Sequence, residues 1–192
     1  MHKHALVAAI AIVLCTPLVS EAGAKLAKGT LTGSVSPTDI STGACAPVVD
    51  ANGTDAYDSM CAATNPSDCK CLIASNLTLS SSFGRGTAVL TATEDNSTIV
   101  DTASNASGCS PAFAVVTLSI NAKGKIPAST QTLNAIGAVC GSPGTTTVNV
   151  LGGFSIEGSD SNPAASGSGI FNGTVSTTGQ VSIALTGLIT NP

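Results

Sequence analysis

The stretch TVNVLGGFSIEG, residues 147–158, alternates apolar side chains with polar or small ones. Val148, Val150, Phe154 and Ile156 fall on one parity, so an extended chain turns all four toward the same face. A period of two is the pattern of a β-strand, whereas an amphipathic helix repeats every ~3.6 residues. The stretch therefore predicts a strand that packs on one face only.

The same alternation runs through most of the chain, and no segment after residue 25 keeps a helical stripe. Further stripes are formed by Val181, Ile183, Leu185, Gly187 and Ile189, by Ala114, Val116, Leu118 and Ile120, and by Cys71, Ile73, Ser75, Leu77 and Leu79. Turn-forming residues, mainly Gly, Pro, Asn and Asp, separate the stripes. We expect strands near residues 28–36, 70–80, 86–94, 97–102, 112–122, 130–140, 146–157, 168–176 and 180–189.

About eight or nine short strands at this spacing are typical of all-β proteins. The prediction is an antiparallel eight- to nine-stranded barrel, with a two-sheet sandwich as the alternative. Membrane barrels carry girdles of aromatic residues, but this chain has one tyrosine, Tyr57, and four phenylalanines. We therefore expect no membrane span in the mature chain.

The first 24 residues have the pattern of a secretory signal peptide. Lys3 precedes an apolar run from Ala5 to Leu14, and small residues at Ala22 and Ala24 form a cleavage site. We expect cleavage near Ala24 and export to the periplasm or the cell exterior. Residues 25–192 are then expected to form a single barrel domain with a cysteine-rich loop at about residues 44–70.

Cleavage at this site changes the chemistry that the chain can perform. Both histidines, His2 and His4, are removed, which excludes catalysis and metal binding through imidazole. Cys15 is also removed, which turns an odd set of seven cysteines into an even one. The few basic residues are scattered, so the mature surface has no footprint for nucleic acid.

One disulfide follows from a hairpin argument. If strands 112–122 and 130–140 pair across the turn between them, Cys109 lies opposite Cys140 at the open end of the hairpin. An even set of cysteines in an exported chain is typical of a disulfide framework. We therefore predict a disulfide between Cys109 and Cys140.

The other four cysteines leave two pairings open. Cys69 and Cys71 lie on one strand face, where their Cα atoms are too far apart for easy bridging. The pairings are Cys45–Cys69 with Cys61–Cys71, or Cys45–Cys71 with Cys61–Cys69. A four-thiolate metal site is the competing interpretation, but the paired C-x-x-C motifs of such sites are missing. We expect these cysteines to connect the loop to the barrel covalently.

An acidic loop offers oxygen ligands for calcium. Asp50, Asn52, Asp55 and Asp58 alternate within a short segment. The glycine and the bidentate glutamate of an EF-hand have no counterparts, so turn formation explains the segment better. The sequence predicts no metal and no cofactor.

Two charged residues are candidates for a role beyond solvation. Glu157 ends the apolar stripe of residues 148–156 and is placed to lie in or beside a barrel mouth, where a carboxylate can serve as an acid or base. Arg85 is the single arginine and precedes a predicted strand, where it can meet an anionic ligand. The remaining acids, Glu94 among them, fall mostly at predicted turns.

The C-terminal stretch from Gly152 to Ile189 resembles the closing strands of allene oxide cyclase-like and dirigent-like barrels. The likeness is carried by Gly152, Gly153, Ala164, Ala165, Gly167, Gly169 and Gly173. The families' aromatic residue in the connection is missing, and Ser159, Asp160 and Ser161 stand where glycine is expected. The resemblance implies a closed eight-stranded antiparallel barrel, and it transfers no catalytic residue because none matches by position.

The sequence thus predicts an exported, disulfide-stapled barrel without catalytic machinery. Its expected role is to bind a small apolar ligand in the barrel or a protein partner outside the cell. One alternative is a cyclase or isomerase that uses a carboxylate such as Glu157. The other is a structural component of a surface or matrix.

Overall fold

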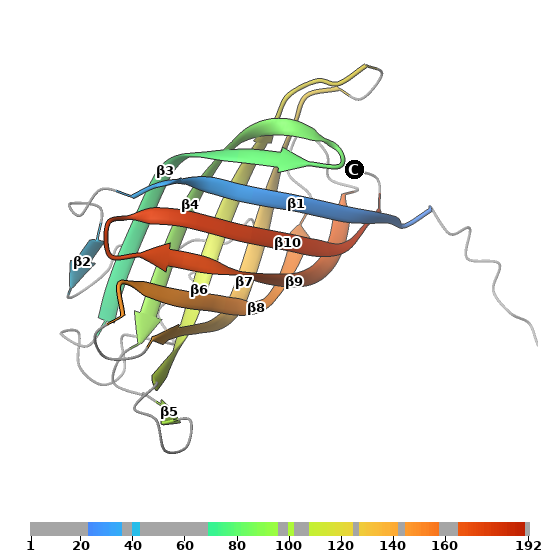
Figure 1. The fold of residues 1–192 in the computed structure, drawn as a ribbon. Helices are drawn as coiled ribbons and strands as arrows, with labels where there is room; N and C mark the ends of the chain where they lie inside the picture. The colour runs from blue at the N-terminus through green and yellow to red at the C-terminus, as the bar shows by residue number, and fades with distance from the viewer. Residues whose placement is uncertain are drawn as a thin grey trace, which may run out of the picture.

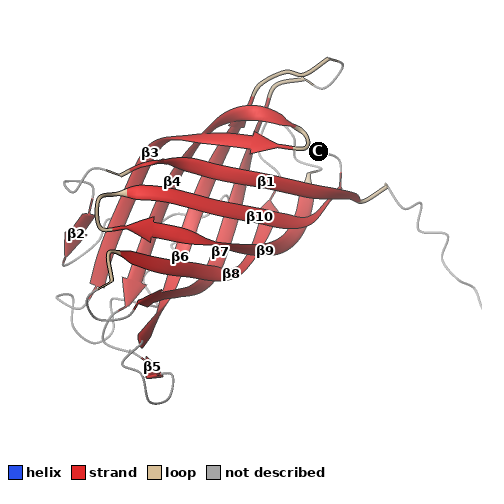
Figure 2. Cartoon of the chain, viewed as in Figure 1, coloured by secondary structure: helices blue, strands red, loops and turns tan. Residues whose placement is uncertain are grey.

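The computed structural model describes residues 23–35, 40–42, 69–95, 100–101, 108–124, 127–141, 145–157 and 165–190. Every regular element within these ranges is a β-strand (Figure 2). The strands are β1 (Lys25–Ser34), β2 (Ile40–Thr42), β3 (Cys69–Ser81), β4 (Gly84–Asp95), β5 (Val100–Asp101), β6 (Gly108–Ile120), β7 (Ser129–Gly141), β8 (Thr147–Glu157), β9 (Ser166–Ser176) and β10 (Gln180–Thr190).

Eight of these strands form a closed antiparallel barrel. Their order is β1-β10-β9-β8-β7-β6-β4-β3, and β3 pairs back with β1 to close the ring. In Figure 1, β1, β10, β9 and β8 form the near wall, and the strands of the far wall cross behind it at a steep angle. The short strands β2 and β5 add to β3 and β6. The predicted barrel is confirmed, and the sandwich alternative is wrong.

The hairpin of β6 and β7 has the predicted register, with Cys109 opposite Cys140. The first strand of this hairpin is longer than expected, because it begins at Gly108 and continues through Pro111. Proline has no N–H to donate within a central strand, yet Pro111 is part of β6. On the side away from β7, β6 pairs first with β5, up to Cys109, and then with β4, from Ala112 onward. Pro111 lies between these two pairings.

The stripe predicted along residues 71–79 is wrong in its first half. Leu77 is buried as expected, but Ile73 is 45% exposed and its neighbour Ala74 is buried. The register between β3 and β4 shifts between Ala74 and Leu77, which marks a β-bulge. Because a bulge adds one residue to one strand, every side chain before it changes face.

Asn76 provides the conformation that the bulge requires. Its φ is 65°, in the left-handed region that asparagine tolerates better than most residues. The bulge separates two parts of β3 with different neighbours. Before it, β3 pairs with β2 through residues 70–72, and after it β3 pairs with β1 through residues 78–81. The bulge therefore lies where β3 leaves β2 and closes the barrel against β1.

The two ends of the barrel differ. The end that holds the start of β6 and the end of β7, with Cys109 and Cys140, is called the disulfide end below. The opposite end holds the turn between β3 and β4, where Phe83 packs against the core. The Oγ atom of Ser81 accepts hydrogen bonds from the backbone N–H groups of Phe83 and Gly84, at 3.3 and 3.2 Å, and orders this turn. Between the two ends the interior is filled by leucines that are almost fully buried: Leu31, Leu77, Leu79 and Leu133.

Candidate ligand-binding site

The disulfide end of the barrel contains a cavity of about 370 Å³. Its walls come from β3, β4, β6, β7, β8, β9 and β10, so the cavity lies inside the ring of strands. Pockets that bind small molecules range from roughly 300 to 1,000 Å³. A second hollow at the opposite end has a volume of only about 40 Å³, which is too small for an organic ligand.

The cavity exists because small side chains replace large ones on three adjacent strands. Deeper in the barrel, Leu90, Val116 and Leu133 lie in register on β4, β6 and β7 and fill the interior. Two residues closer to the disulfide end, the same three strands present alanines to the interior. These alanines, with a fourth on β6, are called the small-residue wall: Ala92, Ala112, Ala114 and Ala135.

Phe171 lies against glycines on the neighbouring strands. Gly137 and Gly152 are opposite each other in register, and Gly152 is in turn opposite Phe171. A Cβ atom at Gly137 or Gly152 would lie 2.8 or 2.7 Å from Cζ of Phe171, so the ring occupies the space of the missing side chains. The ring of Phe171 therefore packs over Gly137 and Gly152, and Phe171 is part of the cavity lining.

A second pair of glycines gives the same arrangement deeper in the barrel. Gly169 and Gly187 face each other on β9 and β10, and a Cβ atom on either would lie 2.6 or 3.0 Å from Cζ of Phe154. Phe154 is buried and belongs to the core. The two glycine pairs thus decide where the aromatic rings lie, and with them the space that stays open.

The lining of the cavity is apolar inside and polar at its mouth. Apolar side chains dominate the interior, including Leu72, Leu90, Val150, Phe171 and Ile183. Lys70 and Glu94 lie opposite each other at the ends of β3 and β4 that form part of the mouth. Ser176 and Thr177, at the end of β9 and in the turn after it, are also part of the lining at this end.

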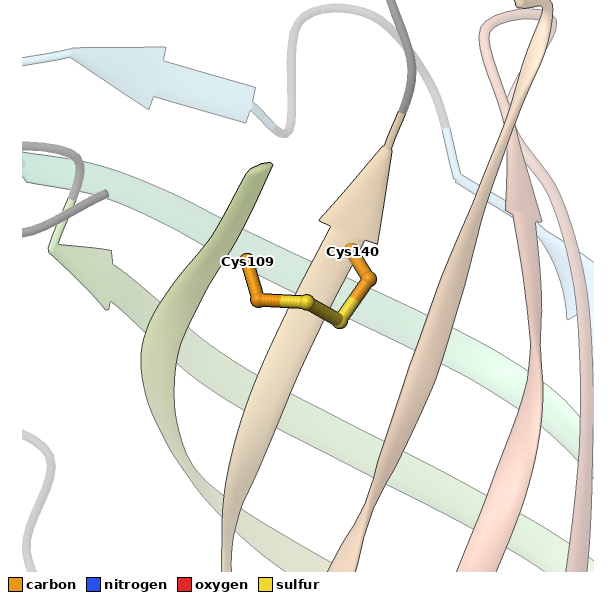
Figure 3. Close-up of a disulfide and its surroundings, with 2 residues drawn as sticks. All are labelled: Cys109 and Cys140. Carbon is orange, nitrogen blue, oxygen red and sulfur yellow. A yellow bond between two sulfur atoms is a disulfide. The ribbon is translucent and has the colours of Figure 1, made fainter. Parts of the chain in front are cut away.

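A disulfide fastens the strands at the mouth. Cys109 of β6 is bonded to Cys140 of β7, with their Cα atoms 4.0 Å apart (Figure 3). This confirms the predicted bridge. Cys71 is also disulfide-bonded. Its possible partners are Cys45, Cys61 and Cys69, whose side chains lie outside the described part of the chain. The two pairings left open by the sequence therefore stay predictions.

The charged residues singled out from the sequence lie away from the cavity. Glu157 ends β8 at the opposite end of the barrel, next to the inward-facing Ile156, and therefore faces outward. Arg85 is exposed near the start of β4, also at the opposite end. The lining of the cavity includes neither of them. Glu94, expected where the predicted strand 86–94 meets a turn, lies within β4 and at the mouth.

The calcium candidates Asp50, Asn52, Asp55 and Asp58 lie outside the described residues. Within the described ranges, no group of three or more His, Cys, Asp or Glu residues is placed to hold a metal ion. The same ranges contain no helix that is long and apolar enough to cross a membrane.

No protein family model matches this chain, and no curated protein or solved structure matches it. The resemblance to allene oxide cyclase-like and dirigent-like barrels therefore stays a prediction. The geometry of the cavity itself is the basis for a function.

Proposed function

We propose that this protein binds a small apolar molecule inside the disulfide end of its barrel and acts by binding rather than by catalysis. The observation that carries the proposal is the cavity of about 370 Å³ behind the small-residue wall. Natural cores are packed to the density of organic crystals, with few voids larger than a water molecule. A void of this size at an end of a barrel is better explained by an occupant than by poor packing.

The volume limits the size of the ligand. A dry apolar cavity of about 150 Å³ accommodates benzene. By proportion, this cavity accommodates roughly 15 non-hydrogen atoms. At about 0.3 kcal/mol per atom, the efficiency that drug-sized ligands reach, such a ligand binds with about 4.5 kcal/mol, which corresponds to a Kd near 0.5 mM. A ligand that fits the walls closely is expected to bind more tightly.

Catalysis by a carboxylate has less support. A general acid or base must reach the reacting atoms of the substrate, and Glu157 lies at the opposite end from the cavity. Among the described acidic residues, only Glu94 contributes to the lining, and it does so at the mouth. The interior beyond it is apolar, which suits retention of a ligand better than proton transfer.

We further propose that the protein works outside the cytoplasm. The signal-peptide pattern of residues 1–24 supports this location. Disulfides persist in oxidising compartments, and the bonded state of Cys109, Cys140 and Cys71 agrees with such a place. Sequencing the amino terminus of protein purified from its source tests the location: a start at Lys25 supports export, and an intact Met1 contradicts it.

Titration with a neutral hydrophobic dye of the right size, such as N-phenylnaphthylamine, tests the binding role. The proposal predicts a saturable increase in fluorescence with one site per chain. The variant Ala114→Leu fills the small-residue wall and is expected to abolish the increase. Ala184→Leu makes the same change at an exposed position of β10 and is the matched control, expected to bind as the wild type does. Equal dye binding by all three proteins would contradict the proposal.

A further inference from the structure

Two opposite charges lie side by side at the mouth of the cavity. Lys70 and Glu94 are cross-strand neighbours on β3 and β4, and both contribute to the lining. Their positions share the inward parity of Leu72 and Ala92, which directly oppose each other two residues deeper. Charged groups of both signs therefore border the entrance, while the interior is apolar.

We propose that the ligand is an apolar alcohol, or another molecule with one uncharged group that both donates and accepts hydrogen bonds, held with that group at the mouth. This inference rests on the proposed function. Burying an unpaired polar group in an apolar cavity costs roughly 2–7 kcal/mol. A ligand with a single polar group therefore places that group among the polar residues of the mouth and its apolar body inside.

The pair at the mouth selects against charged groups. A carboxylate there would be attracted by Lys70 and repelled by Glu94, and an ammonium group would meet the reverse. In both cases the two effects largely cancel, while the charged group still loses part of its hydration.

A hydroxyl group complements both residues at once. It carries one donor and two acceptor sites, whereas the lysine ammonium only donates and the ionised glutamate only accepts. One hydroxyl can therefore donate a hydrogen bond to Glu94 and accept one from Lys70 at the same time. Hydrogen bonds to charged groups are also stronger than those between neutral groups.

Competition with the dye tests this inference on the whole mature protein. Decanol, decanoate and decylamine share one alkyl chain and differ in the charge of the end group at neutral pH. At low salt, where screening is weak, we expect decanol to displace the dye at about one tenth of the concentration that either charged probe needs.

Two variants change the selectivity in opposite directions. Glu94→Gln leaves Lys70 without its neighbouring carboxylate, and decanoate is expected to bind about threefold to tenfold more tightly than to the wild type. Lys70→Gln is expected to improve decylamine binding by a similar factor. Glu157→Gln and Lys28→Gln remove the same charges at the opposite end of the barrel, and they are expected to leave all three probes unchanged.

The outcomes separate this inference from the proposed function. If the dye binds the wild type but not Ala114→Leu, and decanoate or decylamine displaces it best, the inference is wrong while the binding role stands. An unchanged preference in Glu94→Gln and Lys70→Gln would also overturn the inference. If the dye does not bind at all, the proposed function itself fails.

Discussion

Gly152 lies beneath the ring of Phe171, so that a Cβ atom at this glycine would be 2.7 Å from Cζ of the ring. The same Cβ would overlap the carbonyl oxygen of Ile136 on the next strand. Glycine is therefore required here for two reasons, the close approach of the backbone and the position of the ring. Because Phe171 lines the cavity, this contact also helps to set the shape of the site.

The first prediction concerns this contact. Gly152→Ala is expected to lower the free energy of unfolding by about 1–3 kcal/mol, because overpacking displaces the ring and the strand. Gly153→Ala is the control, since its Cβ would have only an ordinary contact, 3.6 Å from the carbonyl oxygen of Gly169. Urea unfolding of both variants is the measurement. Equal stability of the two variants would show that the ring does not need the glycine.

The second prediction concerns the small-residue wall. Ala114→Leu is expected to raise the free energy of unfolding by about 1–2 kcal/mol, since each CH₂ group buried in an existing void contributes about 0.8 kcal/mol before the cost of ordering the side chain. Enlarging a residue in a closely packed core has the opposite effect. The sign of the change in a thermal or urea melt therefore tells whether the void is real, and a clear loss of stability would show that it is filled.

The third prediction concerns the disulfide between Cys109 and Cys140, which closes a segment with a sequence separation of 31. Replacing both cysteines by serine is expected to lower the free energy of unfolding by about 3–4 kcal/mol, mainly because the unfolded chain gains freedom. Unfolding is measured without reducing agent, so that the bond at Cys71 stays intact. A loss below about 1 kcal/mol would contradict this, because it would mean that the bond hardly restricts the unfolded chain.

The fourth prediction concerns the bulge in β3. Asn76→Ala is expected to cost about 1 kcal/mol, because alanine resists the left-handed conformation that asparagine adopts at a φ of 65°. Asn76→Gly is expected to change stability by less than about 0.5 kcal/mol, since glycine reaches this conformation freely. The order of the two midpoints in urea is the readout. If Asn76→Ala were as stable as Asn76→Gly, the conformation would not limit the choice of residue.

Much of the fold could be predicted from the sequence, because alternation of side chains is a local property. The stripe that contains Phe154 and Ile156 faces the interior as expected, and the register of β6 with β7 followed from a simple hairpin. The bulge could not be predicted in the same way. One added residue at Asn76 reverses the faces of β3, and nothing in the apolar pattern records where the reversal occurs.

The cavity was harder to predict than the strands. Ala92, Ala114 and Ala135 come from three different strands, and they form one wall only because β4, β6 and β7 are neighbours in this register. The signal was present in each strand as a change from leucine or valine to alanine toward one end. The predicted strand ended at Glu94 because an Asp and an Asn follow it, whereas β4 continues through Asp95.

A crystal structure of the protein in complex with the neutral dye shows whether the disulfide end of the barrel holds an apolar ligand. One dye molecule is expected at the disulfide end, in contact with Phe171 and Ala114 and with Lys70 and Glu94 beside the opening to solvent. Dye bound on the outer wall of the barrel, with the interior filled by side chains, would contradict it.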